Sequence, residues 1–152
     1  MTDTLKSYFS VAPPTDKYME TLFHQYSEAG EAAGSDSYKM FNNRWMPYAY
    51  AAFLGISVNR REKLEPPLIN DRFKFEVVFN QNRDYAHALI LAALSQCNEF
   101  EDIMDRAKIM SIISEYAKGG AMQMEEYSSE GKFNFASSEG FLHEIMNREE
   151  KL

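Results

Sequence analysis

The chain contains a single cysteine, Cys97, among its 152 residues. One thiol excludes an internal disulfide and the multi-cysteine zinc sets, so we interpret Cys97 as a buried structural thiol. No apolar run approaches the ~20 residues that a membrane-spanning helix needs. No apolar segment follows a basic start, as it does in a signal peptide. We therefore expect a cytoplasmic protein that makes no contact with a membrane.

The sequence also lacks the usual signatures of an enzyme. It has no glycine-rich phosphate-binding loop, and its histidines, His24, His87 and His143, are not spaced like zinc ligands. Asp84 precedes His87 by one helical turn, but a capping aspartate beside an ordinary helical histidine is the simpler interpretation. We predict no cofactor, no metal site and no catalytic residue.

Strand-like alternation of apolar and charged residues is confined to the stretch from Phe73 to Val77. A lone strand has no partner, so we expect an extended connector or a strand that another subunit completes. Asp71 and Glu76 flank Lys74 here, which leaves a metal-dependent nuclease subunit as the least favoured alternative.

Elsewhere, apolar residues recur at the spacings of three and four that are typical of helices. The pattern predicts helices over residues 18–26, 45–54, 83–96, 103–116, 122–127 and 138–146. The sequence thus predicts an all-α fold, a single compact bundle-like domain of about six helices over residues 15–152. We expect at most one short strand pair, and a tail over residues 1–14.

Capping residues and glycines define the expected helix ends. Thr15 or Asp16 is expected to cap the first helix, and Asn42 or Asn43 the second. Gly55 is expected to end the second helix, and the Gly119–Gly120 pair to stop or bend a later one. The expected core residues are apolar and lie on the helical stripes: Ala52, Leu54, Leu89, Ala93, Ile109, Ile112 and Tyr116.

The stretch from Trp45 to Lys63 joins an uncharged aromatic helix directly to a basic loop. Two interpretations of the aromatic residues Trp45, Tyr48, Tyr50 and Phe53 remain open. They either pack in the core, which is their commoner use, or form an aromatic cage for a ligand.

Charge is distributed unevenly along this acidic protein. The net charge is −7, yet residues 38–83 hold eight bases and four acids, a net +4, so the remainder carries −11. We predict that a basic surface contacts DNA or an acidic partner through Asn59, Arg60, Arg61, Lys63, Arg72, Lys74 and Arg83. The alternative is a solvated loop with local ion pairs, such as Arg61 with Glu65.

Four segments of the chain together resemble a known family. They are Ala-Tyr-Ala-Ala-Phe-Leu-Gly-Ile, Asn-Arg-Arg-Glu-Lys-Leu, Ala-Leu-Ile-Leu-Ala-Ala-Leu-Ser and Ile-Ile-Ser-Glu-Tyr-Ala-Lys-Gly-Gly, all between residues 41 and 127. The most distinctive pieces are Leu54-Gly55 with Arg60-Arg61-x-Lys63, and Glu115-Tyr116-Ala117-x-Gly119-Gly120. The chain resembles small accessory proteins of bacterial Dnd gene clusters, which handle DNA phosphorothioation and restriction of phage. The resemblance implies a non-enzymatic component of a bacterial DNA-modification and anti-phage defence system, with other proteins of that system as partners.

A protein-interaction or oligomerisation module without DNA contact is the competing interpretation. Residues 73–79 would then complete a sheet in a homo-oligomer. The late methionines Met110, Met122, Met124 and Met146 suit an adaptable docking surface, although core filling is their commoner use.

Overall fold

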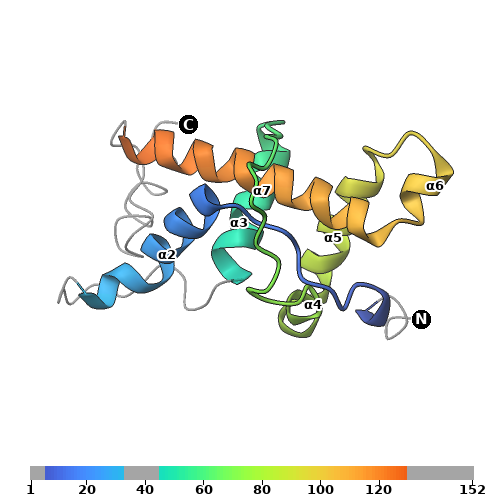
Figure 1. Cartoon of the computed structure of the whole chain (residues 1–152), viewed down its shortest axis with the longest axis horizontal. Helices are drawn as coiled ribbons and strands as arrows, with labels where there is room; N and C mark the ends of the chain where they lie inside the picture. Colours follow the sequence, from blue (N-terminus) through green and yellow to red (C-terminus); the bar gives the residue numbers. More distant parts are fainter. Residues whose placement is uncertain (1–5, 33–44, 130–152) are drawn as a thin grey trace, which may run out of the picture.

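The fold is built on a long helix, α7, that the other helices cross or cover (Figure 1). The computed structural model describes residues 6–32 and 45–129. Its helices are α2 (Lys17–Ala32), α3 (Trp45–Ser57), α4 (Glu76–Gln81), α5 (Arg83–Leu94), α6 (Phe100–Ile103) and α7 (Arg106–Ser129). Within these ranges β pairing is limited to one isolated bridge between Thr15 and Ile69. The all-α prediction is confirmed.

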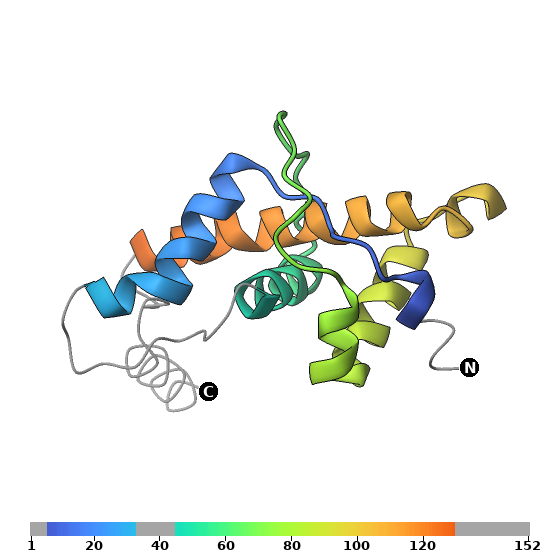
Figure 2. The ribbon, with the colours of Figure 1, turned by 60° about the horizontal axis from the view of Figure 1, so that its bottom comes forward.

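The most extensive contact between helices is the crossing of α3 over α7 (Figures 1 and 2). Glycines allow it, because a Cβ on Gly55 would overlap the carbonyl oxygen of Tyr116. A Cβ on Gly120 would overlap the carbonyl oxygen of Ala51 in the same way. The prediction that Gly55 ends its helix is wrong, since α3 continues to Ser57. Gly119 and Gly120 were expected to stop or bend a later helix, and they do not stop it, since α7 continues to Ser129. Here glycine provides close backbone approach instead of a turn.

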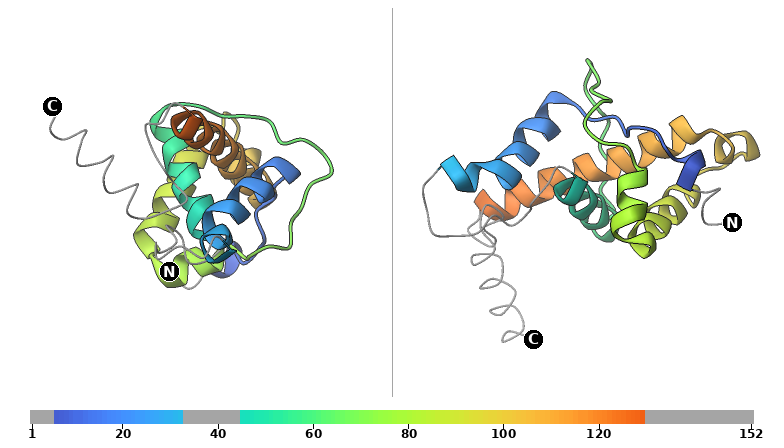
Figure 3. Two further views of the ribbon diagram at one scale, coloured as in Figure 1. Left: turned by 90° about the vertical axis from the view of Figure 1, so that its left-hand side faces the viewer. Right: turned by 90° about the horizontal axis from the view of Figure 1, so that it is seen from below.

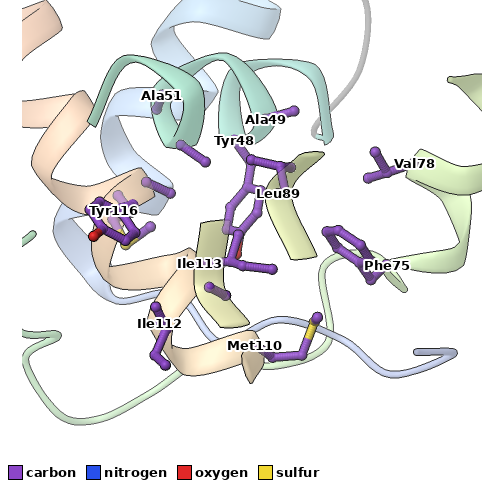
Figure 4. Packing of buried hydrophobic residues seen from close by; sticks show 14 of the residues in the cluster. Tyr48, Ala49, Ala51, Phe75, Val78, Leu89, Met110, Ile112, Ile113 and Tyr116 are labelled. Carbon is purple, nitrogen blue, oxygen red and sulfur yellow. The ribbon is translucent and has the colours of Figure 1, made fainter. Parts of the chain in front are cut away.

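The buried core surrounds this crossing (Figure 4). Of the expected core residues, Leu54 is half-buried and the other six are buried: Ala52, Leu89, Ala93, Ile109, Ile112 and Tyr116. Tyr48 is fully buried at the centre, and its hydroxyl lies 2.7 Å from the hydroxyl of Ser114. This bond satisfies both buried hydroxyl groups, which would otherwise cost free energy. Met110 and Met124 are also buried, so these two methionines fill the core and form no docking surface.

Residues 76–79 of the expected extended stretch 73–79 are helical, so the prediction of a strand here is wrong, and only residues 73–75 belong to a connector. Helix α4 occupies Glu76–Gln81, and the buried residues Phe75, Val78 and Phe79 follow helical spacing. The alternation covers too few residues to specify a strand, whereas a helix buries all three of these side chains on one face. Asn82 then caps α5, because its side-chain oxygen accepts a hydrogen bond from the amide of Tyr85 at 3.2 Å.

Two further predictions need correction near α7. The expected helix over residues 103–116 breaks after α6, and α7 starts at Arg106. Asp105 causes the new start, because its carboxylate accepts hydrogen bonds from the amides of Ala107 (3.0 Å) and Lys108 (3.2 Å). The expected helix over residues 122–127 is the last part of α7. The expected caps Asn42 and Asn43 and the expected helix over residues 138–146 lie outside the described residues.

Two non-helical segments run across the helices and pair with each other (Figures 2 and 3). One is the predicted tail after a helical turn at residues 6–8, and it is packed where described, with Phe9 and Pro13 buried. The other connects α3 to α4. Thr15 and Ile69 exchange two backbone hydrogen bonds of 2.7 and 2.8 Å between them, and the amide of Phe75 donates to the carbonyl of Val11 at 2.8 Å.

A buried ion pair fixes this pairing to α7. Asp16 is fully buried, and its carboxylate lies 2.7 Å from the ammonium of Lys118, which also donates to the carbonyl of Lys63 at 3.0 Å. The same carboxylate accepts hydrogen bonds from the amides of Met19 and Glu65, both at 3.0 Å. Burial alone raises the pKa of Asp16, but the amide of Glu65, the ammonium of Lys118 and the amide of Met19 outweigh it. The pKa of Asp16 is therefore lowered.

We expect Gly120→Ala to destabilise the protein by about 1–3 kcal/mol, because the added methyl group forces α3 and α7 apart. This is opposite to the stabilisation of up to about 1 kcal/mol that the same change gives in an open helix. The unfolding free energy in urea measures the difference. Lys108→Ala, at an exposed position of the same helix, is the control and should change stability by less than about 0.5 kcal/mol. A stabilised Gly120→Ala protein would contradict the close crossing.

We expect Asp16→Asn to cost about 3–5 kcal/mol at pH 7, because it leaves the buried ammonium of Lys118 without a counter-charge. A lowered folded-state pKa means that the carboxylate stabilises the protein above the unfolded value of 3.8. That contribution is lost as the pH falls through the folded pKa, so the difference from wild type should shrink below pH 3.8. Urea denaturation at several pH values tests this. Asp71→Asn, whose side chain is exposed, should show little difference at any pH.

Candidate functional site

The predicted basic site begins where α3 ends. Asn59 has a positive φ of 56°, and it is this residue that takes the left-handed position that ends the helix. The amide of Arg60 donates to the carbonyl of Gly55 at 2.8 Å, and that of Asn59 to the carbonyl of Ile56 at 3.1 Å. These two bonds form a Schellman motif, which turns the chain sharply back over α7. Arg60 therefore lies beside α7, where its carbonyl packs against Gly119.

Arg60 is held by side chains of α7 and of its own loop. Its guanidinium lies 3.1 Å from the carboxylate of Glu126 and 3.3 Å from that of Glu62, and it donates to the amide oxygen of Gln123 at 3.3 Å. Partial burial lowers the pKa of the Arg60 guanidinium, but Glu126 and Glu62 raise it by more. A DNA phosphate would have to compete with these two carboxylates.

The other two arginines nearest to the loop are also engaged. Arg61 pairs with Glu115 of α7 at 2.6 Å, and not with Glu65, which was the example of a local pair in the alternative interpretation. Arg72 pairs with Glu20 of α2 at 3.2 Å. Most of these ion pairs join the α3–α4 connection to a helix distant in sequence. The arginines therefore fasten the connection to the helices.

The remaining cations of the predicted site are Lys63, Lys74 and Arg83. All three are exposed, and none makes an ion pair within residues 6–32 and 45–129. Lys63 and Lys74 lie in the connection between α3 and α4, and Arg83 is the first residue of α5. The structure thus divides the predicted set into three paired arginines and three exposed cations, with exposed Asn59 between α3 and the loop.

An apolar groove lies between α3 and α5. Its volume is about 560 Å³. Its lining is mostly apolar and aromatic, and consists of Trp45, Met46, Ala49, Tyr50, Phe53, Asp84, Tyr85 and Ala88. The rings of Phe53 and Tyr85 meet edge to face across it, with centroids 5.3 Å apart. Core packing is thus found for Tyr48, and Trp45, Tyr50 and Phe53 are half-buried against the core while they also line this groove. The alternative of an aromatic cage for a ligand stays a prediction.

Asp84 and His87 do not form a shared site. Asp84 lines the groove, whereas the ring of His87 packs edge to face on Phe79, with centroids 5.7 Å apart. No group of three or more potential metal ligands comes together in the part of the chain that the structure describes. Among the same residues, no helix combines the length and the apolar character needed to cross a membrane.

A second surface, which the sequence did not indicate, is the short helix α6 at one end of the molecule (Figure 1). Its apolar residues Phe100, Ile103 and Met104 are 74%, 40% and 61% exposed. They lie at i, i+3 and i+4, so they share one face, which we call the α6 knob. Glu99 and Glu101 are exposed beside it, and Asp102 is half-buried.

The N-terminal segment holds the α6 knob in place. The hydroxyl of Tyr8 donates a hydrogen bond to the carbonyl of Met104. Arg106 donates to the carbonyl of Tyr8 at 3.2 Å, and its guanidinium lies 5.7 Å from the centre of the Tyr8 ring. The Tyr8 ring in turn meets the buried ring of Phe9 edge to face. These contacts therefore fix the position of α6 while its apolar side chains stay exposed to solvent.

No family model, curated protein or solved structure matches this chain. The two motifs most distinctive of the resemblance nevertheless meet in space. Gly55 packs on Tyr116, Arg60 packs on Gly119, and Arg61 pairs with Glu115. These residues form the helix crossing and the loop fastened to it. Their arrangement thus gives both motifs a packing role at the crossing.

Proposed function

We propose that the protein is a non-catalytic binding component that attaches to another protein through the α6 knob. The observation that carries the proposal is the exposure of Phe100, Ile103 and Met104 on one helix face. Contiguous exposed apolar side chains with polar residues around them are typical of protein-binding surfaces. Because Tyr8 and Arg106 already fix α6, little conformational entropy is lost when a partner binds.

The chemistry of the α6 knob defines the partner. Phe100 and Met104 suit an apolar pocket, in which an aromatic anchor contributes much of the binding energy. The acidic groups of Glu99, Glu101 and Asp102 surround the α6 knob, so the pocket should have lysine or arginine at its rim. A second copy of this chain fits poorly, because two acidic surfaces of a protein with net charge −7 would repel each other.

The test is site-specific photocrosslinking in cells, with a photoreactive phenylalanine analogue at position 100. The same analogue at Leu68, an exposed apolar residue of the α3–α4 connection, is the matched control. We expect a crosslinked partner from position 100 that is absent from position 68. With that partner purified, Phe100→Asp should weaken binding by at least tenfold, and added salt should weaken wild-type binding.

Other results would contradict the proposal. Identical crosslinking patterns from positions 100 and 68 would mean that the α6 knob is not the contact. A crosslink to this chain itself, with self-association lost in Phe100→Asp, would replace the heterologous partner by a second copy.

DNA contact is the second candidate, and the exposed cations of the predicted site favour it. Among the described residues, Lys63, Lys74 and Arg83 have no carboxylate to displace, unlike Arg60 and Arg61. The Dnd resemblance implies a component of bacterial DNA-modification and anti-phage defence. This implied role rests on the motifs at the α3–α7 crossing. Those motifs support a shared fold more directly than a shared activity.

For DNA contact we expect weak binding with a slope of log affinity against log salt of roughly −2.7, which corresponds to three phosphate contacts. The triple change Lys63→Ala, Lys74→Ala, Arg83→Ala should abolish this slope. The control, Arg60→Ala with Arg61→Ala, should leave the slope unchanged and reduce stability by about 0.2–1 kcal/mol per lost exposed ion pair. Fluorescence anisotropy with duplex DNA and urea denaturation measure the two effects. Equal affinity of the triple variant and wild type would exclude this candidate.

A further inference from the structure

The α3–α5 groove has the size and the lining of a small-molecule site. Its volume of about 560 Å³ lies within the range of roughly 300–1,000 Å³ that is typical of ligand pockets. Its walls are two helices that contact each other. The rings of Phe53 and Tyr85 meet across it, so part of the lining is already fixed before a ligand arrives. Less conformational entropy is then lost on binding.

Four aromatic side chains determine which chemistry the groove attracts. Trp45, Tyr50 and Phe53 come from α3, and Tyr85 comes from α5. The face of an aromatic ring carries partial negative charge, so it attracts cations, and quaternary ammonium groups are a common ligand of such rings. The apolar surface of the same rings favours an apolar body. The lining therefore suits a molecule that combines a cation with an apolar part.

Asp84 adds a negative charge to this lining. Of the residues that line the groove, it alone belongs to a charged residue type. Among the described residues no cation forms an ion pair with Asp84, and Arg83, its neighbour in the chain, does not line the groove. An acid in the first turn of α5 also interacts favourably with the helix dipole. That role does not require aromatic neighbours, whereas recognition of an organic cation uses both.

We propose that the α3–α5 groove binds a free small organic cation, in which an ammonium group is attached to an apolar or aromatic body. The ammonium group lies at Asp84, which is exposed, and the body lies between the aromatic side chains of the two helices. The net charge of −7 favours the approach of a cation. The proposal does not depend on the function of the α6 knob, which lies on a different element.

Trp45 provides a direct measurement, because it is the single tryptophan of the chain and it lines the groove. The probe is benzyltrimethylammonium, titrated into the full-length protein. Benzyl methyl sulfone, which is uncharged, and phenylmethanesulfonate, an anion, carry the same benzyl group and are the comparison compounds. We expect a saturable change in Trp45 emission, with the cation bound roughly tenfold more tightly than the sulfone and the anion bound most weakly.

Two substitutions separate the charge of Asp84 from the aromatic lining. Asp84→Asn should weaken binding of the cation about threefold. It should leave binding of the sulfone unchanged, which also verifies that the groove is intact. Tyr85→Leu, at a position that is 49% exposed, removes a ring but keeps an apolar side chain, and should lower the preference for the cation over the sulfone about threefold. The matched control Asp71→Asn removes an exposed carboxylate outside the groove and should change neither affinity.

Three results would overturn the proposal. Equal affinities for the cation, the sulfone and the anion would mean that the groove is merely apolar. A linear response of Trp45 to the cation, without saturation, would mean that no site is filled. A cation affinity that is the same in Asp84→Asn and in wild type would remove the charge recognition. A trimethyllysine peptide that binds more tightly than benzyltrimethylammonium would replace the free cation by a modified protein segment.

Discussion

The close approach of α3 and α7 is the constraint on which the rest of the structure depends. Gly55, Gly119 and Gly120 bring backbone against backbone, so the crossing point has no side-chain layer between its partners. Glycine within a helix costs about 0.5–1 kcal/mol relative to alanine. That cost is offset by the packing that the crossing permits, in which Tyr48, Ala51 and Tyr116 are all buried. The other elements then cover the sides of the crossed pair.

Electrostatic contacts secure the segments that pass over this crossing. The Asp16–Lys118 pair joins the start of α2 to α7, and Arg60 and Arg61 join the end of α3 to α7. The local excess of positive charge in the sequence is thus matched in part by acids from distant parts of the chain, at Arg60, Arg61 and Arg72. A charge asymmetry along a sequence therefore does not by itself give a charged patch in space, because folding can bring opposite charges together.

Sequence periodicity predicted most of the fold but little of the surface chemistry. The helices around Tyr48, Leu89 and Ile112 follow directly from apolar spacing, because burial of one face is what stabilises a helix. The prediction of helix ends at glycines failed because a glycine without a side chain can serve either a turn or a close contact between two backbones. The residue that packs against the glycine determines which of the two occurs, and that residue is distant in sequence. The partners of Arg60 and Arg61, and the exposure of Phe100, depend on three-dimensional neighbours that local spacing does not specify.

The helix crossing has a consequence for how the chain folds. Gly55 meets Tyr116, and Ala51 meets Gly120, so the central contacts join residues some sixty positions or more apart. The contact between α4 and α5, by contrast, is between neighbours in the chain. Closing a long loop costs entropy before the contact gives any stability, and such contacts slow folding. The α4–α5 hairpin should therefore form early, and docking of α3 on α7 should be the late, rate-limiting event that orders the two overlying segments.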